Sequence, residues 1–221
     1  MYHMENISEN KWNIYNKSRM NVNSWTDNSL MAQYLKGRVL DMGCSSGVLL
    51  SKIKGVTEKY GIDLSRKAIQ KAQKRDPSSN FFVADVCHTL FPNNYFDFVY
   101  SLEVLEHILD PSSMLKEIKR ILKPGGYGYI QTPNYPIKRL YDFLYWLKGD
   151  RESALDDYTH ISKLSSFAIK KLIAKEFEII NFRPRNIILE KRIPFIQKMK
   201  NNGNFIGNIL GQKIIVIFKK V

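Results

Sequence analysis

Residues 38–47 have the sequence Arg38-Val39-Leu40-Asp41-Met42-Gly43-Cys44-Ser45-Ser46-Gly47. An apolar run typical of a buried strand ends in an acid and continues into a glycine-bearing turn. In doubly wound α/β sheets, such a strand, a tight turn and a helix N-terminus form the corner where backbone N–H groups face a ligand. Gly43 lets the backbone approach that ligand closely, and Gly47 lets the next helix begin close to it. The stretch therefore predicts a ligand-binding corner.

The acid at the end of this strand narrows the class of ligand. Asp41 would repel a phosphate group, whereas it would attract an ammonium or sulfonium group. This charge preference favours S-adenosylmethionine over a dinucleotide such as NAD.

The composition is that of one globular domain. The 221 residues are 44% apolar, enough for one sizeable core. The longest apolar stretches, such as Ile214 to Phe218, fall far short of the roughly 20 residues of a membrane span. The first ten residues are polar and lack the apolar region of a signal peptide. We therefore expect a single cytoplasmic domain over residues 1–221, in which Cys44 and Cys87 are reduced packing residues.

The net charge of +13 bears on partners. A field of this sign attracts RNA, acidic metabolites or an anionic lipid surface, but it does not choose among them. A solvated basic face is the simpler explanation.

Short apolar strands alternate with helical stretches along the chain. This alternation predicts a doubly wound α/β fold with a mostly parallel, seven-stranded sheet. The helices begin at Ser65 and at Asp110-Pro111, which are suitable caps, and later at Ser165 or Ser166. The expected strands are Arg38–Met42, Lys59–Asp63, Phe81–Asp85, Phe96–Leu102, Tyr127–Thr132, Glu178–Pro184 and Lys213–Lys219.

Three segments interrupt this rhythm. Residues 134–160 form a helical insertion after the fifth strand, which packs on the domain, covers the substrate as a lid, or lies on a membrane surface. Residues 1–34 form an N-terminal helical segment that could close over the substrate with the insertion. Ile187–Gly211 is expected to be an irregular loop. The apolar residues at helical spacing in the insertion are Ile137, Leu140, Tyr141, Leu144 and Leu147.

Two further acids end the next two strands. Asp63 can accept two hydrogen bonds from a ribose diol, and Asp85 can accept one from an adenine amino group. Three acids on three consecutive strand ends, one of them beside a glycine turn, are a stronger signal than any one alone.

With these motifs, the chain resembles the class I S-adenosylmethionine-dependent methyltransferases, within the small-molecule group called type 11. The resemblance covers roughly Leu35 to Asn134 and implies a Rossmann-like methyltransferase fold. The family usually has glycine where this chain has Ser45, and we expect Ser45 to fit with a negative φ. The cofactor-binding residues that the resemblance implies are Asp41, Gly43, Cys44, Gly47, Asp63, Leu64, Asp85, Val86 and Leu102.

The run Glu103-Val104-Leu105-Glu106-His107 follows the fourth strand directly. As the first turn of a helix, it would place Glu103, Glu106 and His107 on one face. Such a group could hold a divalent cation, Mg²⁺ or similar, that lowers the pKa of a substrate hydroxyl. Alternatively His107, beside Glu106, is the general base. A purely structural or substrate-contact role is the third interpretation.

The same run is similar to that of two metal-assisted groups, the ubiquinone-biosynthesis O-methyltransferases and the enzymes that methylate small-RNA 3′ ends. In the RNA enzymes a further histidine completes the metal site. The resemblance therefore implies His160, in Asp157-Tyr158-Thr159-His160, as a fourth ligand.

We expect a methyltransferase that acts on a hydroxyl of a small molecule. An anionic small molecule is one candidate substrate. Methylation of RNA or another nucleic acid is the alternative, and a non-catalytic module that only binds S-adenosylmethionine is another. The sequence selects neither the acceptor nor an oligomeric state.

Overall fold

The computed structural model describes residues 28–135, 137–147, 149, 159–185 and 211–221. Most of the N-terminal segment 1–34, which was predicted to be helical and to close over the substrate, and nearly all of the predicted loop Ile187–Gly211 lie outside these residues. The same holds for residues 150–158 of the insertion.

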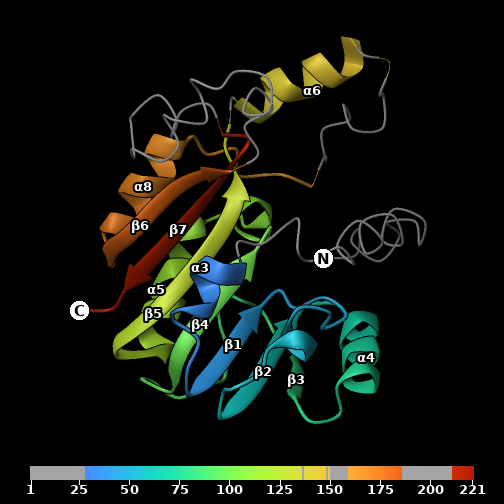
Figure 1. Ribbon diagram of the computed structural model, residues 1–221, viewed down its shortest axis with the longest axis vertical. Coiled ribbons are helices and arrows are strands. Elements are labelled where there is room, and N and C mark those ends of the chain that lie inside the picture. The colour runs from blue at the N-terminus through green and yellow to red at the C-terminus, as the bar shows by residue number, and fades with distance from the viewer. Residues whose placement is uncertain (1–27, 136, 148, 150–158, 186–210) are drawn as a thin grey trace.

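The sheet has seven strands in the order β3-β2-β1-β4-β5-β7-β6, and β7 is antiparallel to both of its neighbours (Figure 1). All other pairs are parallel. The predicted doubly wound, mostly parallel α/β fold is confirmed. The strands are β1 (Arg38–Met42), β2 (Glu58–Asp63), β3 (Asn80–Val83), β4 (Phe96–Leu102), β5 (Leu122–Pro133), β6 (Glu178–Arg185) and β7 (Lys213–Lys219).

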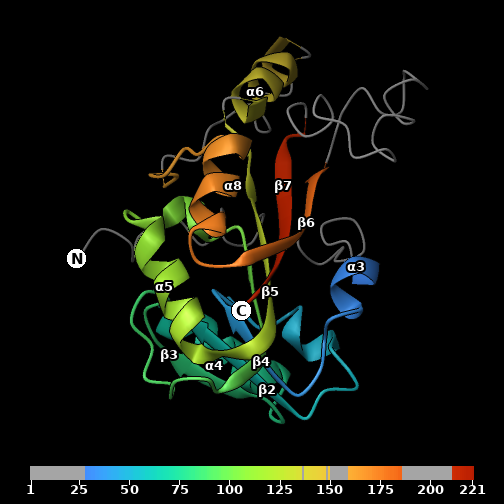
Figure 2. The ribbon, with the colours of Figure 1, turned by 90° about the vertical axis from the view of Figure 1, so that its left-hand side faces the viewer.

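Helices cover both faces of the sheet (Figure 2). Leu40 and Met42 of β1 pack in the same apolar cluster as α5 (Pro111–Ile121) and α8 (Ser166–Ala174). Val39, the residue before Leu40, lies in a second cluster with α3 (Asn28–Ala32), α4 (Arg66–Arg75) and the short helix η1 (Leu50–Lys52). Because successive strand residues point to opposite faces, one apolar run supplies both cores.

The predicted helix caps are present. Ser65 Oγ accepts a hydrogen bond from the Ala68 amide at 3.2 Å, at the start of α4. The Asp110 carboxylate accepts from the Ser112 amide at 3.0 Å, with Pro111 as the first residue of α5. Of the two candidates before α8, Ser165 is the cap. Each of these N-caps fixes the residue at which its helix begins.

The helix α6 (Ile137–Leu147) follows β5 and lies beyond the carboxyl end of the sheet in both views (Figures 1 and 2). Its apolar stripe is divided, since Leu140 is 52% exposed and Leu147 59%, whereas Tyr141 is buried. Asp142 is also buried and is paired to Lys138 at 2.8 Å. Part of the stripe is thus packed and part is exposed, and the three interpretations of the insertion stay predictions. Among the described residues, no helix is long and apolar enough to cross a membrane.

Candidate functional site

The carboxyl ends of the parallel strands bring the three predicted acids to one edge of the sheet. Asp41 is paired in register with Gly61 of β2, and Asp63 with Val83 of β3. The Ala84 amide donates to the Asp63 carbonyl at 3.2 Å, so the residue before Asp85 is hydrogen-bonded to the end of β2. This edge is where open α/β sheets bind ligands.

The turn after β1 is held against β2. The amides of Gly43 and Cys44 both donate to the Ile62 carbonyl, at 2.8 and 2.9 Å. Gly43 has a φ of +81°, and a Cβ there would lie 2.3 Å from a methyl carbon of Val104. Glycine is therefore required at this position by conformation and by packing. At Gly47, φ is +68° and a Cβ would lie 3.0 Å from both Ala72 and Phe81.

Ser45 departs from its prediction. Its φ is +50°, in the left-handed region, where a side chain is strained by about 1–2 kcal/mol. Its hydroxyl oxygen is buried without a hydrogen-bond partner among the described residues. The expectation of a negative φ is therefore wrong. The turn follows the backbone path of a glycine because the Ser45 amide donates to the Asp63 carboxylate at 2.9 Å.

This strain predicts that Ser45→Gly stabilises the protein. Removing the Cβ from a left-handed position and an unpartnered hydroxyl from a buried one should raise the free energy of unfolding by about 1 kcal/mol. Urea denaturation measures it, with Ser46→Gly as the control, because Ser46 is equally buried but has no positive φ. A Ser45→Gly protein no more stable than the parent would contradict the left-handed turn.

Asp41 is buried and hydrogen-bonded from within the sheet. The Tyr100 hydroxyl on β4 donates to it at 2.9 Å. Burial raises the pKa of Tyr100 well above its usual value, and the Asp41 charge adds to the effect, so the phenol stays protonated as a donor. Burial, together with the charges on Asp41 and Asp63, likewise raises the pKa of Cys44, which stays a thiol. Cys44 is thus a packing residue of the turn.

Asp63 orders two turns at once. Its carboxylate accepts from the Ser45 amide and from the Ser65 amide, both at 2.9 Å, one on each oxygen. A carboxylate oxygen can accept two hydrogen bonds, so a ribose hydroxyl could donate to either one. Leu64, beside it, is 56% exposed and offers an apolar surface at the same edge.

Asp85 and Val86 follow β3. Asp85 is exposed, and one of its carboxylate oxygens accepts from the Cys87 amide at 2.8 Å. Val86 is buried in the core. Paired hydroxyl acceptors, an exposed apolar side chain and a further carboxylate suit the ribose and adenine of a nucleoside, so these residues fit the cofactor that the sequence predicts.

Glu103 lies outside the predicted helical face. It directly follows Leu102, the last residue of β4, and has a φ of +57°, so it precedes the helical turn η2 (Leu105–His107) instead of starting it. Lys213 at the start of β7 pairs with its carboxylate at 2.7 Å. The prediction that Glu103, Glu106 and His107 share one helix face is therefore wrong for Glu103.

Glu106, His107 and His160 do come together. One ligand-type atom from each lies within 4.8 Å of the other two. The two imidazole rings are 4.9 Å apart at their centroids. His160 is brought there because the amides of Ile161 and Ser162 both donate to the Glu106 carbonyl at 2.9 Å. Residues distant in sequence are thus joined through backbone hydrogen bonds.

Hydrogen bonds orient both rings. Nδ1 of His107 lies 3.0 Å from the Thr159 carbonyl oxygen, and Nδ1 of His160 lies 2.6 Å from the Tyr135 hydroxyl. A ring that donates from Nδ1 to a carbonyl carries its lone pair on Nε2. The Thr159 hydroxyl also lies 3.0 Å from Nδ1 of His107. In the tautomer in which this Nδ1 donates to the Thr159 carbonyl, Nε2 is suited to take a proton or bind a cation.

Glu106 is the most buried member of the group, at 1% exposed. One carboxylate oxygen accepts from the Thr132 hydroxyl at 2.9 Å. The other has no hydrogen-bond partner among the described residues and lies 3.9 Å from Nε2 of His160. Burial raises the pKa of Glu106, and the charge on Glu103 raises it further. A buried, half-satisfied carboxylate beside two imidazoles is the arrangement expected where a proton or a cation is held.

The sequence analysis did not single out several residues that contact this site, among them Tyr100, Tyr135, Thr159 and Lys213. Tyr100 and Lys213 look like ordinary strand residues, and only the pairing of strands shows what they contact. Thr159 is adjacent to His160, and Tyr135 lies two residues after Pro133, the last residue of β5. Their proximity to these motifs was the only signal in the sequence.

Comparisons with known proteins agree with this geometry. A family model described as a methyltransferase domain matches residues 21–177, more than half of the chain. A solved S-adenosylmethionine-dependent methyltransferase from Thermotoga maritima covers 96% of this chain and 97% of its own, with a TM-score of 0.68 at 18% identity. Fold and site thus define the class of S-adenosylmethionine-dependent methyltransferases, and the chain belongs to the methyltransferase-domain family.

Two curated relatives are more similar in sequence over shorter spans. A ubiquinone biosynthesis O-methyltransferase from Thiobacillus denitrificans is 36% identical over 104 residues, 44% of each chain. A 2-methyl-6-phytyl-1,4-hydroquinone methyltransferase from Synechocystis is 31% identical over 128 residues, which is 55% of this chain and 40% of the relative. The matches therefore span less than half the length of these relatives.

Proposed function

We propose that this chain transfers a methyl group from S-adenosylmethionine to a hydroxyl oxygen of a small molecule. The observation that carries the proposal is the group made by the buried Glu106 and the partly buried His107 and His160, which meet just beyond the end of β4, beside the cofactor edge. The relatives named as O-methyltransferases support an oxygen atom as the acceptor of the methyl group.

The chemistry requires a group of this kind. A neutral hydroxyl is a weak nucleophile until its proton is removed, and the methyl donor carries a sulfonium that an oxygen must approach in line. His107 is suited to accept the proton at Nε2, because its Nδ1 is held at the Thr159 carbonyl. Glu106 and His160 lie within reach of the same position.

The three side chains also fit a divalent cation, which would lower the pKa of an acceptor hydroxyl and hold it in place. The unpartnered oxygen of Glu106 would be one ligand, with one nitrogen from each histidine. Two imidazoles and one carboxylate suit Mn²⁺, Fe²⁺ or Zn²⁺ better than Mg²⁺, which prefers oxygen ligands and near-octahedral geometry. Thr159 and Tyr135 would orient the two imidazole ligands toward the cation, because they hydrogen-bond to the other nitrogen of each ring.

Removing metal tests this part of the proposal. Treatment with a chelator should abolish methyl transfer to a catechol-type acceptor, and Mn²⁺ should restore it more fully than Mg²⁺. Calorimetric binding of S-adenosylhomocysteine should be unchanged, which serves as the control. Full activity after chelation would instead assign the proton transfer to His107 alone.

Product formation decides between a small-molecule and a nucleic-acid acceptor. A labelled methyl donor should label hydroxylated aromatic small molecules and leave RNA unlabelled. Labelled RNA, for which the charge of +13 is the supporting feature, would overturn the small-molecule proposal. Cofactor binding without product from either pool would indicate a binding module.

A further inference from the structure

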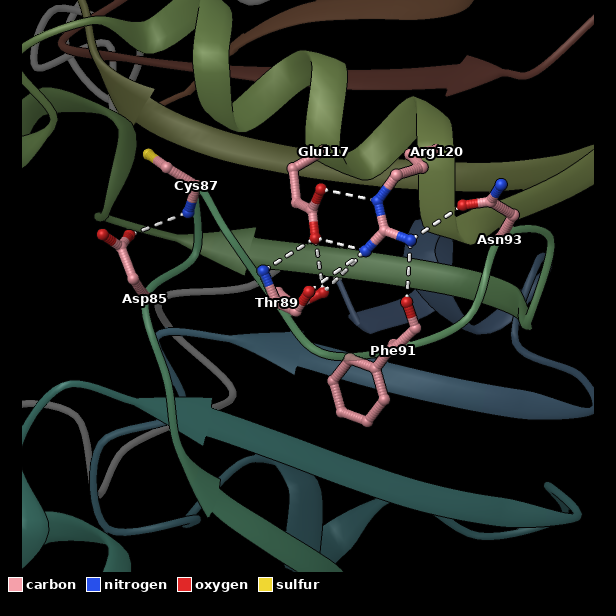
Figure 3. Close-up of polar contacts among 7 residues, drawn as sticks. All are labelled: Asp85, Cys87, Thr89, Phe91, Asn93, Glu117 and Arg120. Atoms are coloured by element: carbon pink, nitrogen blue, oxygen red, sulfur yellow. Dashed lines mark hydrogen bonds and ion pairs between the residues drawn. The ribbon is translucent and has the colours of Figure 1, made fainter.

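The helix α5 carries a polar cluster that neither the cofactor site nor the catalytic group uses (Figure 3). Glu117 and Arg120 point from this helix onto the loop between β3 and β4. Nε of Arg120 donates to the Glu117 carboxylate at 2.9 Å and Nη2 donates to it at 2.7 Å. Burial would raise the pKa of Glu117, but the hydrogen bonds from Arg120 and Thr89 outweigh it and lower that pKa, so the pair is charged.

Each partner of this pair also binds the loop. The Glu117 carboxylate accepts from the Thr89 amide at 2.7 Å and from the Thr89 hydroxyl at 2.5 Å. Nη1 of Arg120 donates to the Phe91 carbonyl and to the Asn93 side chain, both at 2.8 Å. A weaker bond of 3.2 Å runs from Nη2 to the Thr89 carbonyl. One guanidinium and one carboxylate therefore hold three positions of the loop.

The near end of this loop is the adenine side of the proposed cofactor site. Asp85 starts the loop, where its carboxylate accepts from the Cys87 amide at 2.8 Å and its carbonyl accepts from the His88 amide at 3.2 Å. Thr89 follows His88 and is held by Glu117 and Arg120 of α5. Val86 is buried in the core and Phe91 packs against it, whereas Asp85 and Leu90 are exposed, so the polar bonds to Thr89 act on the part of the loop between these two apolar anchors.

The geometry points to Glu117 and Arg120 as positioning residues for adenine recognition, acting through Thr89 to hold Asp85 where it meets the 6-amino group. This inference rests on the proposed cofactor function and adds residues that do not touch the cofactor. Holding the acceptor in place before binding reduces the ordering that binding must supply. We call Glu117, Arg120 and Thr89 with their hydrogen bonds the clamp. Breaking one of these hydrogen bonds should weaken the recognition of the 6-amino group and leave the rest of cofactor binding unchanged.

The test compares two ligands by calorimetry, S-adenosylhomocysteine and S-inosylhomocysteine, in which a carbonyl oxygen replaces the 6-amino group. We expect the parent protein to prefer the adenosyl ligand by about 10-fold, the value of one hydrogen bond to a charged acceptor. Asp85→Ala should remove most of this preference. Arg120→Met and Thr89→Val should reduce it at least threefold, and Thr89→Ser, which keeps the hydroxyl, should retain it.

Lys119→Met is the matched control. Lys119 lies on the same helix and is paired with Glu176 at 3.0 Å, so its loss removes an ion pair without touching the loop. Its ligand preference should equal that of the parent. Should Arg120→Met fail to fold, Thr89→Val and Thr89→Ser carry the comparison alone.

The outcomes separate the inference from the proposed function. Thr89→Val with a lower melting temperature but an unchanged preference would show a merely structural clamp and overturn the inference. A parent protein that binds both ligands equally, with Asp85→Ala unchanged, would overturn the role of Asp85 while leaving cofactor binding in place. A parent that binds neither ligand would overturn the proposed function itself.

Discussion

His107→Ala should reduce methyl transfer by about 10²- to 10⁴-fold, the range typical of losing a positioned acid or base. Binding of S-adenosylhomocysteine should change by less than about threefold, because His107 lies with Glu106 and His160 and not on the Asp63 side of the edge. The imidazole is held by Thr159 at Nδ1, so the loss reflects chemistry at Nε2. Single-turnover kinetics with saturating cofactor measures it.

A second histidine variant separates the two mechanisms for the same group. His160→Ala should match the loss in His107→Ala if both rings hold a cation, and should cost much less if His107 acts alone as a base. His88→Ala is the control, because this exposed side chain lies in the loop after β3. Turnover by His107→Ala at the parental rate would leave catalysis to proximity and orientation and contradict the assignment.

Asp63→Ala should weaken the binding of S-adenosylhomocysteine by about 1–3 kcal/mol, or roughly 5- to 160-fold. The carboxylate is the proposed acceptor for the ribose diol, and it also holds the amides of Ser45 and Ser65. Both turns at this edge therefore lose an anchor together with the ligand contact. Isothermal calorimetry gives the affinity, and thermal melting gives the accompanying loss of stability.

Asp63→Asn distinguishes the two contributions. The amide keeps one carbonyl oxygen, so only one of the two backbone bonds can persist, and binding should fall between the parent and Asp63→Ala. Glu176→Gln, which breaks a surface ion pair with Lys119, is the control and should bind as the parent does. Equal affinity in the parent and in Asp63→Ala would remove Asp63 from the cofactor site.

Local sequence was sufficient for the fold. The strand Arg38–Met42 and the caps Ser65 and Asp110 were predicted because each depends on neighbours within a few residues, as apolar runs and helix caps do. The sheet edge followed from the same patterns, since parallel strands place their carboxyl ends together. Asp41, Asp63 and Asp85 could therefore be assigned to one edge before any contact was known.

Contacts between distant segments decided the details of the site. Helical spacing placed Glu103 with Glu106, but the ion pair with Lys213, which lies 110 residues away, holds it elsewhere. The stripe of α6 is partly buried at Tyr141 and exposed at Leu140 and Leu147, because periodicity shows that a helix has an apolar face and not what that face packs against. Sequence patterns carry the local preference for strand, helix and turn. The left-handed Ser45, the approach of His160 to Glu106 and the hold of Arg120 on the loop come from hydrogen bonds that only the closed fold brings within reach.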